Sequence, residues 1–427
     1  MAASKHAEAS QLTSPHRYAD NVLTTQRIDP ILTPGQVATH VHAVIGGSNF
    51  GLDLTSSDAL RNSSCTSVPI REDKSSYWYP VRPFKAMELT LIWKNGSFSY
   101  VDGRLGLTAR SDYLFNNSAN ATTPFPDDFR MISGDPDLRT INASSFAQQA
   151  VTFLCLADGG VSRRYKEIPH GECPNGLRSQ INFPSCWDGK NVDSADHRSH
   201  VAFLSAGPDS GMCEDPAFPY TLPRIFMEVY WITQVWDVYR SQSYFPDQPF
   251  VFANGDPTGY GYHADFFNGW EPAALKNALD YCHCNPYGDP SCCVAQGLFT
   301  FNQESRCYIT DSVDEQTKGN SAALPGANPV QAPCFESYTA TSTPAIVGPV
   351  YAYDGDIGGM YTLQHDALDV VATPTSATVR ASSSTEEAQD AQGTCIYNGA
   401  APVAITPSMR SIAVSVAMLF SFLILHS

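Results

Sequence analysis

The stretch RIFMEVYWI, residues 224–232, indicates which kind of fold the chain adopts. Every second side chain in it is large and apolar, in the row Ile225, Met227, Val229 and Trp231. Glu228 stands in the other row, between two aromatic residues. Because successive side chains of a strand point to opposite faces, this period of two predicts a half-buried β-strand.

Further strands are expected on both sides of this stretch. AMELTLIWK (86–94) alternates in the same way, and VTFLCLA (151–157), HVAFLSA (200–206) and PFVFAN (249–254) are expected to be short buried strands. The segment EPAALKNALDYC (271–282) instead repeats apolar residues at helical spacing, with Pro272 near its start. Many strands with one or two short helices predict a mainly β fold: a β-sandwich or jelly roll with long, disulfide-tied loops.

The composition of the 427-residue chain narrows the classes of function. Hydrophobic residues make up 43% and charged residues only 16%, and the net charge is −17. A chain this acidic lacks the basic stripe that displaces counterions from nucleic acid, and an anionic membrane surface would repel it. The hydrophobic content, the low charged fraction and the acidic net charge together predict a globular extracellular protein whose partner is neutral and polar, such as a glycan.

The chain has twelve cysteines at irregular spacing. The tightest cluster, CHCNPYGDPSCC (282–293), lacks the C-x2-C pairs of structural zinc modules. Disulfides are therefore expected throughout, which indicates an oxidising compartment. Cys173 and Cys186 bracket a turn-rich stretch and could close one such loop. Five N-x-S/T sequences permit glycosylation there, at Asn62, Asn95, Asn116, Asn120 and Asn142.

The C-terminus carries the pattern of a GPI-anchor signal. Small residues begin at Asn398, a short spacer follows, and the apolar run SIAVSVAMLFSFLIL nearly reaches the end of the chain. The alternative is a tail-anchored helix, for which this run is short. Such an anchor requires entry into the secretory pathway, yet the first 21 residues contain no apolar signal segment. A wrongly assigned start is therefore expected.

These features divide the chain into five parts. The parts are an N-terminal segment (1–21), a core domain (22–281), a cysteine-rich extension packed on it (282–368), a Ser/Thr-rich stalk (369–397) and the anchor signal (398–427), which is removed.

Five of the eleven histidines lie in three polar stretches rich in Gly and Asp. HVH places His40 and His42 on one face of a strand, where two imidazoles can hold one metal ion. His197 and His200 follow in DHRSH, and His263 in GYHAD. The expected ligands of a divalent metal, whose identity stays open, are His40, His42, His197 and His263.

Carboxylates in the same stretches and elsewhere offer a second chemistry. A glycosidase needs a pair of carboxyl groups, and a lyase uses a His or Tyr base. The residues expected to act in catalysis are His200, Asp196, Asp265 and Glu228. The residues expected to bind a sugar or its carboxylate are Trp187, Tyr260, Tyr262, Trp270 and Arg178. The structural alternative is that these groups are loop hydrogen bonds, core rings and an ordinary salt bridge.

Six ordered blocks of the chain resemble a known family. They are RIDPILTPGQVATHVHAVIGGSNF, SSYWYPV, FPDDFRMISGDP, CPNGLRSQINFPSCWDGKNVDSADHRSHVAF, LPRIFMEVYW and NGDPTGYGYHADFFNGW. Together, over residues of about 22 to 282, they are similar to the fungal domain of unknown function DUF1996. The resemblance implies a fungal, extracellular setting and the limits of the domain, and it assigns no activity.

Two hypotheses of function follow. The first is a GPI-anchored cell-wall protein that binds or modifies wall polysaccharide through a cleft lined by the His and Asp residues. If it is an enzyme, it is a glycan-active hydrolase, a lyase or a metal-dependent oxidase. The second is a non-enzymatic surface sensor or wall-structural module, in which the same residues hold loops together. Neither hypothesis fixes an oligomeric state.

Overall fold

The computed structural model describes residues 21–80, 90–92, 94, 98–100, 110–114, 122–284, 291–302, 306–317, 321–340, 343–354 and 359–362. The chain divides into two compact units, 1–385 and 386–427, and the described residues all belong to the first. Among them, no helix combines the length and the apolar character needed to cross a membrane.

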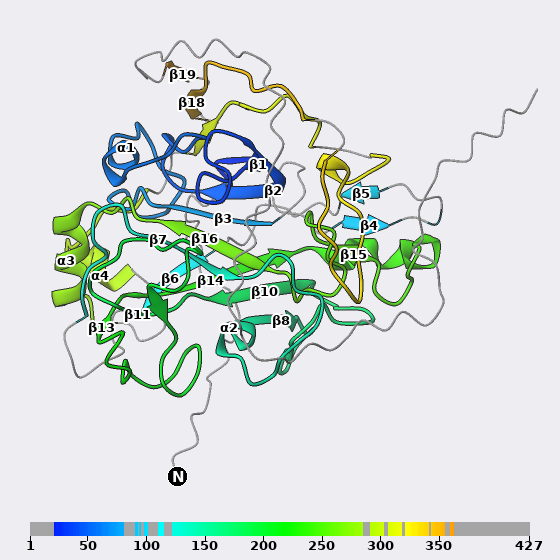
Figure 1. Ribbon diagram of the computed structural model, residues 1–427, viewed down its shortest axis with the longest axis horizontal. Helices are drawn as coiled ribbons and strands as arrows, with labels where there is room; N and C mark the ends of the chain where they lie inside the picture. The colour runs from blue at the N-terminus through cyan, green and yellow to red at the C-terminus, as the bar shows by residue number, and fades with distance from the viewer. Residues whose placement is uncertain are drawn as a thin grey trace, which may run out of the picture. The chain divides into compact units, whose positions relative to one another are not determined.

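Two five-stranded antiparallel sheets dominate the fold (Figure 1). The first sheet has the order β1 (Thr24–Ile28), β2 (Val37–Ile45), β3 (Ser76–Pro80), β16 (His263–Phe267) and β7 (Arg130–Gly134). The second has the order β6 (Arg110–Leu114), β14 (Arg224–Trp231), β10 (Leu177–Asn182), β8 (Val151–Cys155) and β9 (Arg163–Tyr165). The predicted mainly β fold with few helices is confirmed.

The main hydrophobic core lies between these two sheets. The first sheet contributes residues such as Val41, Tyr79 and Phe266, and the second contributes Phe153 and Val229. In β14 the apolar row predicted from the sequence is buried, with Ile225, Met227, Val229 and Trp231 at most 1% exposed. The two sheets therefore pack face to face, because both turn apolar side chains toward this core. The other face of the first sheet is buried too, in a second cluster that contains Val44, Trp78 and Phe267.

Short elements surround the sandwich. Three small sheets join β11 (Cys186–Trp187), β12 (Val201–Ala202) and β13 (Tyr220–Thr221); β15 (Phe250–Val251), β4 (Thr90–Ile92) and β5 (Phe98–Tyr100); and β17 (Cys307–Ile309), β18 (Tyr351–Asp354) and β19 (Gly359–Thr362). The helices are α1 (Ser57–Arg61), α2 (Phe146–Gln149), α3 (Pro272–Tyr281), α4 (Ser291–Ala295), η1 (Thr233–Gln242) and η2 (Pro325–Ala327).

The predicted helix is α3, which has Pro272 in its first turn and buries Leu275, Ala278 and Leu279. Two predicted strands are much shorter than expected, because turns interrupt them. In HVAFLSA only β12 is a strand, and in PFVFAN only β15 is one. After β15 the Gly255 amide donates to the Phe252 carbonyl, which bends the chain.

Disulfides tie the loops together, as expected. The pairs are Cys65–Cys307, Cys155–Cys173, Cys186–Cys213, Cys282–Cys293 and Cys284–Cys292, and Cys334 is also bonded. No cysteine among the described residues is free. The suggested loop between Cys173 and Cys186 is wrong. Instead Cys173 lies beside the end of β8, where the Asn175 amide donates to the Leu156 carbonyl and the Leu156 amide donates to the Gly176 carbonyl, and so it meets Cys155.

The segment that follows the core domain contacts its first strand. The side-chain oxygen of Gln26 accepts hydrogen bonds from the amides of Ser312 and Val313, and the amide of Ile309 donates to the carbonyl of Leu23. The disulfide from Cys65 on the core to Cys307 on β17 fixes the same contact covalently.

Candidate functional site

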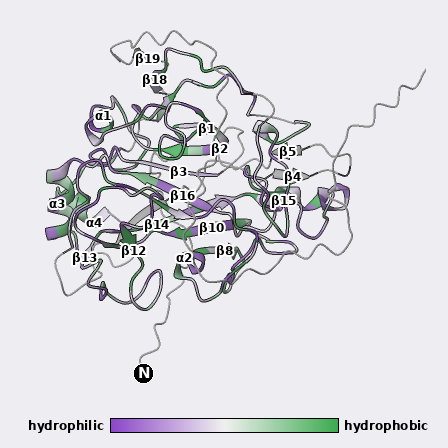
Figure 2. Ribbon diagram, viewed as in Figure 1, coloured by the Kyte–Doolittle hydropathy of each residue, from purple (hydrophilic) through white to green (hydrophobic). Residues whose placement is uncertain are grey.

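Polar side chains gather on the face of the first sheet that points away from the main core. Along β2, Val41 and Ala43 are in the main core, so His40 and His42 point the other way. Along β16, Ala264 and Phe266 are in the same core, so His263 and Asp265 also point outward. Figure 2 shows hydrophobic and hydrophilic residues next to each other along β2 and β16.

The register of three adjacent strands explains how these side chains meet. His42 on β2 pairs with Pro80 on β3, and Asp265 on β16 pairs with Trp78, two residues before Pro80. Strand β3 therefore separates His42 from His263. The two imidazoles approach each other across the position of Pro80.

Three imidazole rings converge at this place, those of His40, His42 and His263, which we call the histidine trio. Nε2 of His40 lies 3.0 Å from Nε2 of His263, and Nε2 of His42 lies 3.4 Å from the same atom. One ligand atom from each residue lies within 4.8 Å of the other two. All three side chains are buried, with at most 4% of the residue exposed.

The outer ring nitrogens fix the tautomers of two rings. Nδ1 of His42 faces the carbonyl of Ile28 at 3.0 Å, and Nδ1 of His263 faces the carbonyl of Gly261 at 3.0 Å. A carbonyl can only accept, so we assign the proton of each neutral ring to Nδ1. Both Nε2 atoms then present lone pairs to each other, 3.4 Å apart with no proton between them.

The third ring cannot resolve this conflict alone. Nδ1 of His40 lies 3.0 Å from the hydroxyl of Thr39, so the proton of His40 can sit on Nε2. The Nε2 proton of His40 can then be donated to Nε2 of His263. The lone pair on Nε2 of His42 still receives no hydrogen bond from the other two rings. With the proton of His40 moved to Nδ1, which faces the Thr39 hydroxyl, a cation at the centre would accept all three lone pairs. The carbonyls behind His42 and His263 orient those rings as outer-shell partners do in metal sites.

Burial keeps the trio uncharged. Desolvation lowers the pKa of His42 to about 4 and that of His263 to about 3. It also lowers the pKa of His40 well below its usual value, with the other two histidines, Arg27 and Arg139 adding to the effect. The neutral ring is the form that binds a metal ion.

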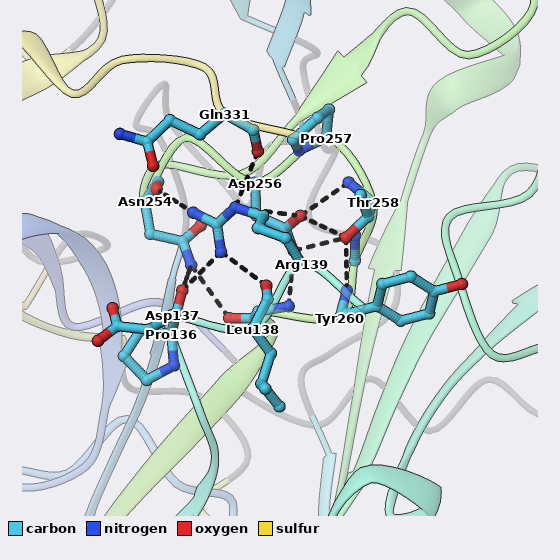
Figure 3. Close-up of polar contacts among 12 residues, drawn as sticks. Pro136, Asp137, Leu138, Arg139, Asn254, Asp256, Pro257, Thr258, Tyr260 and Gln331 are labelled. Carbon is cyan, nitrogen blue, oxygen red and sulfur yellow. Dashed lines mark hydrogen bonds and ion pairs between the residues drawn. The ribbon is translucent and has the colours of Figure 1, made fainter. Parts of the chain in front are cut away.

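A buried polar network around Arg139 and Asp256 holds the turn that precedes β16 (Figure 3). The carboxylate of Asp256 accepts hydrogen bonds from the amides of Gly259 and Gly261 and from Thr258. Arg139 donates to surrounding carbonyls, among them those of Pro136 and Asn254, and its Nε lies 3.8 Å from Asp256. This network fixes the turn whose Gly261 carbonyl holds His263, so Asp256 acts as a structural acceptor.

The turn also requires glycine at position 261. A Cβ there would come within 2.8 Å of the Pro136 carbonyl and of the Arg139 guanidinium. The glycine therefore allows the backbone to approach this network closely.

Two carboxylates lie next to the trio. One ligand atom each from Asp29, His42 and Asp265 lies within 4.8 Å of the other two. Asp265 is 0% exposed, and neither of its oxygens has a hydrogen-bond partner among the described residues. Burial raises the pKa of Asp265 well above its usual value and that of Asp29 to about 6.

The second predicted histidine pair lies outside the trio. Nδ1 of His197 bonds to Asp193 at 2.7 Å, and His200 has Ser194 on one ring nitrogen and the Arg130 carbonyl on the other. Among the described residues, neither histidine belongs to a group of converging ligand atoms. The expectation that His197 joins His40, His42 and His263 in one ligand set is therefore not met.

Two of the residues expected in catalysis have structural partners instead. Asp196 is exposed and accepts hydrogen bonds from Ser194, Arg198 and Ser199, which lowers its pKa. Glu228 lies in the second sheet, where it pairs with Arg178 at 3.0 Å and accepts from Gln180. An acid in the second sheet cannot pair with Asp265, because the main core separates the two.

Most of the residues expected to bind sugar are also placed elsewhere. Trp187, Tyr262 and Trp270 are at most 9% exposed and belong to the main core, so their rings are not available for stacking. Tyr260 is half-buried and donates its hydroxyl proton to Glu167. Arg178 forms the salt bridge with Glu228. Large aromatic rings bury more apolar area than any other side chain, which is why a packed core recruits them.

The structure describes only some of the residues predicted to carry glycans or the lipid anchor. Asn142 is exposed, and Asn62, at the end of α1, is exposed as well. Asn95, Asn116, Asn120 and Asn398 lie outside the described residues.

Sequence reasoning missed Asp29 and Arg139. Asp29 stands directly after β1, and Arg139 lies in a loop far from any histidine. No local pattern marks either of them. Only the pairing of β1 with β2 brings Asp29 to His42, since Gln26 pairs with His42.

The lowered histidine pKa values predict a pH dependence of stability in the metal-free protein. The pKa of His42 is about 4 when folded and about 6.5 when unfolded, so between these values the unfolded chain binds a proton that the folded chain does not. The free energy of unfolding then decreases as pH falls from 6.5 to 4, by up to about 1.4 kcal/mol per pH unit for this one group. Asp29 and Asp265 act in the opposite direction, because their raised pKa values keep protons on the folded state.

The contribution of His42 to the pH dependence of the free energy of unfolding is therefore measured by comparing the wild type with His42→Gln. Urea unfolding at a series of pH values between 4 and 7 should show that the variant loses this part of the slope. Parallel curves for the two metal-free proteins would contradict the prediction.

Comparison with known proteins gives one match. A family described as a domain of unknown function, DUF1996, matches residues 29–270, which is more than half of the chain and includes the trio, Asp29 and Asp265. No curated protein and no solved structure matches the chain.

Proposed function

The chain belongs to the DUF1996 family, whose description names no activity, and from the site itself we propose that the domain binds a divalent transition-metal ion through His40, His42 and His263. The observation that carries the proposal is the pair of lone pairs on His42 and His263, which face each other 3.4 Å apart. Imidazole is a good ligand for zinc, copper, iron and nickel.

The spacing of the nitrogens supports the same proposal. Two nitrogens that are each about 2.1 Å from one ion lie about 3.0 Å apart at a right angle and about 3.4 Å apart at the tetrahedral angle. The two Nε2 separations within the trio are 3.0 and 3.4 Å. The rings thus stand at ligand spacing, and small movements suffice to admit an ion.

The wider role we propose is binding or modification of cell-wall polysaccharide at the fungal cell surface, with a lipid anchor attached at Asn398. The acidic, weakly charged composition and the disulfides support an extracellular setting. Because the trio is at most 4% exposed, a polymer does not touch the ion in this conformation, and the ion holds the domain in its binding form.

A second candidate is a wall-structural module or sensor without enzymatic activity. The observation that favours it is that Asp193, Asp196, His197 and His200 are engaged in hydrogen bonds within their own loop or to the neighbouring strand. A glycan-binding assay with metal-loaded and metal-stripped protein separates the two. Loss of polysaccharide binding on stripping supports the first, and absence of binding in both forms supports the second.

Metal analysis tests the site directly. Purified protein, loaded with zinc and then desalted, should retain one ion per chain. We expect His42→Ala and His263→Ala to weaken zinc binding by at least about 100-fold, because even outer-shell partners change affinity by 10–100-fold. The matched control is His170→Ala, which removes an exposed histidine paired with Asp247 and should leave zinc binding unchanged. Retention of zinc by both trio variants, or no retention by the wild type, would contradict the proposal.

A further inference from the structure

We infer that Asp265 is the fourth protein ligand of this ion, so that three imidazoles and one carboxylate form the centre, with Asp29 as a second carboxylate beside it. The inference rests on the proposed metal site and adds to it the anionic ligand and the class of metal.

The first argument is the state of the Asp265 carboxyl group. It is 0% exposed, and within the described residues neither oxygen has a hydrogen-bond partner. Asp256 is a structural carboxylate that can be compared with Asp265. Asp256 is equally buried, but it accepts hydrogen bonds from Thr258, Gly259 and Gly261. A fully buried carboxyl group without such donors needs another partner, and a cation is the strongest one.

The second argument is position. His263 and Asp265 are two residues apart on β16 and share the outward face of the sheet. A carboxylate oxygen of Asp265 lies within 4.8 Å of a ring nitrogen of His42, the residue that belongs to both converging groups. Two ligand atoms on one ion are separated by at most about 4.4 Å. Asp265 is grouped with Asp29 and His42 and not with the trio as a whole, so its side chain would rotate toward the trio to complete the set.

The third argument is charge. Three neutral imidazoles bring no negative charge to a divalent ion, and the nearby guanidinium groups of Arg27, Arg139 and Arg198 add positive potential. A buried ion needs compensation, because the low-dielectric surroundings amplify every uncompensated charge. Asp265 and Asp29 are the carboxylates in place to provide it, and Asp29 is already anchored by the amides of Ile31 and Leu32.

The ligand set also selects the metal. Calcium and magnesium prefer sites made of oxygen ligands, whereas three imidazoles with one carboxylate suit zinc and the neighbouring transition metals. We therefore expect zinc to bind and calcium not to compete with it.

The test measures zinc affinity, by competition with a chromophoric chelator, in the wild type and in Asp265→Asn. Loss of the anionic ligand should weaken zinc binding about 10–100-fold, while the trio still binds the ion. The matched control is Asp193→Asn, which removes the carboxylate paired with Arg130 and His197 and should leave zinc affinity unchanged. Wild-type affinity in Asp265→Asn would overturn the inference and would assign Asp265 as a protonated acid beside Asp29.

A measurement that does not depend on folding of this variant uses the infrared spectrum of the wild type and of Asp29→Asn. Addition of zinc should convert a protonated carboxyl band into a metal-bound carboxylate band in both proteins. A carboxyl band that survives zinc saturation would overturn the inference. If the wild type binds no zinc at all, the proposed metal site fails as a whole, and this outcome is distinct from a trio that binds zinc without Asp265.

Discussion

Asp256→Ala is expected to lower the free energy of unfolding by about 3–5 kcal/mol, the range for removing one partner of a buried charged pair. The substitution leaves Arg139, whose side chain is 1% exposed, without its counter-charge. It also leaves the donors of Thr258, Gly259 and Gly261 without an acceptor in a buried turn. Urea unfolding followed by tryptophan fluorescence measures the loss.

The control for this prediction is Asp196→Ala. Asp196 accepts hydrogen bonds from Ser194, Arg198 and Ser199 in the same kind of loop arrangement, but it is exposed to water. Water can replace its hydrogen bonds, so we expect a loss below about 1 kcal/mol. Because the Gly261 carbonyl orients His263, Asp256→Ala should also weaken zinc binding, and Asp196→Ala should not. Equal losses of stability in the two variants would show that burial is not what makes Asp256 important.

The second large effect is expected from the disulfide between Cys65 and Cys307. These residues are 242 positions apart, so the bond removes much of the conformational freedom of the unfolded chain. The chain-entropy relation gives about 5.5 kcal/mol for a loop of this length. The double variant Cys65→Ala/Cys307→Ala should lose about this much stability, measured by thermal and urea unfolding of the otherwise oxidised protein.

The matched control is Cys284→Ala/Cys292→Ala, which opens a disulfide with a sequence separation of only 8. The same relation gives at most about 2.5 kcal/mol for that loop, because the Cys282–Cys293 disulfide already encloses it. A smaller loss for the long loop than for the short one would contradict the entropic account. Faster proteolysis of the chain around β17 in the Cys65→Ala/Cys307→Ala variant would show that the disulfide also holds the extension against the core domain.

The sequence by itself determined the parts of this protein that depend on local periodicity. The period of two in β14 and the short apolar run of β8 predict strands that the structure contains, and the helical spacing after Pro272 predicts α3. The HVH motif places His40 and His42 on one face of β2 for the same reason. These features follow from the geometry of a few successive residues, which a sequence displays directly.

The tertiary structure decided which distant residues meet. His263 joins His40 and His42 because β3 brings β2 and β16 to its two sides, whereas His197 and His200 remain bonded to their own loop and to β7. Cys155 and Cys186 likewise form disulfides, with Cys173 and Cys213, that the spacing of the cysteines did not indicate. Strand order and register are set by the packing of the whole core, and no pattern within one segment records that packing.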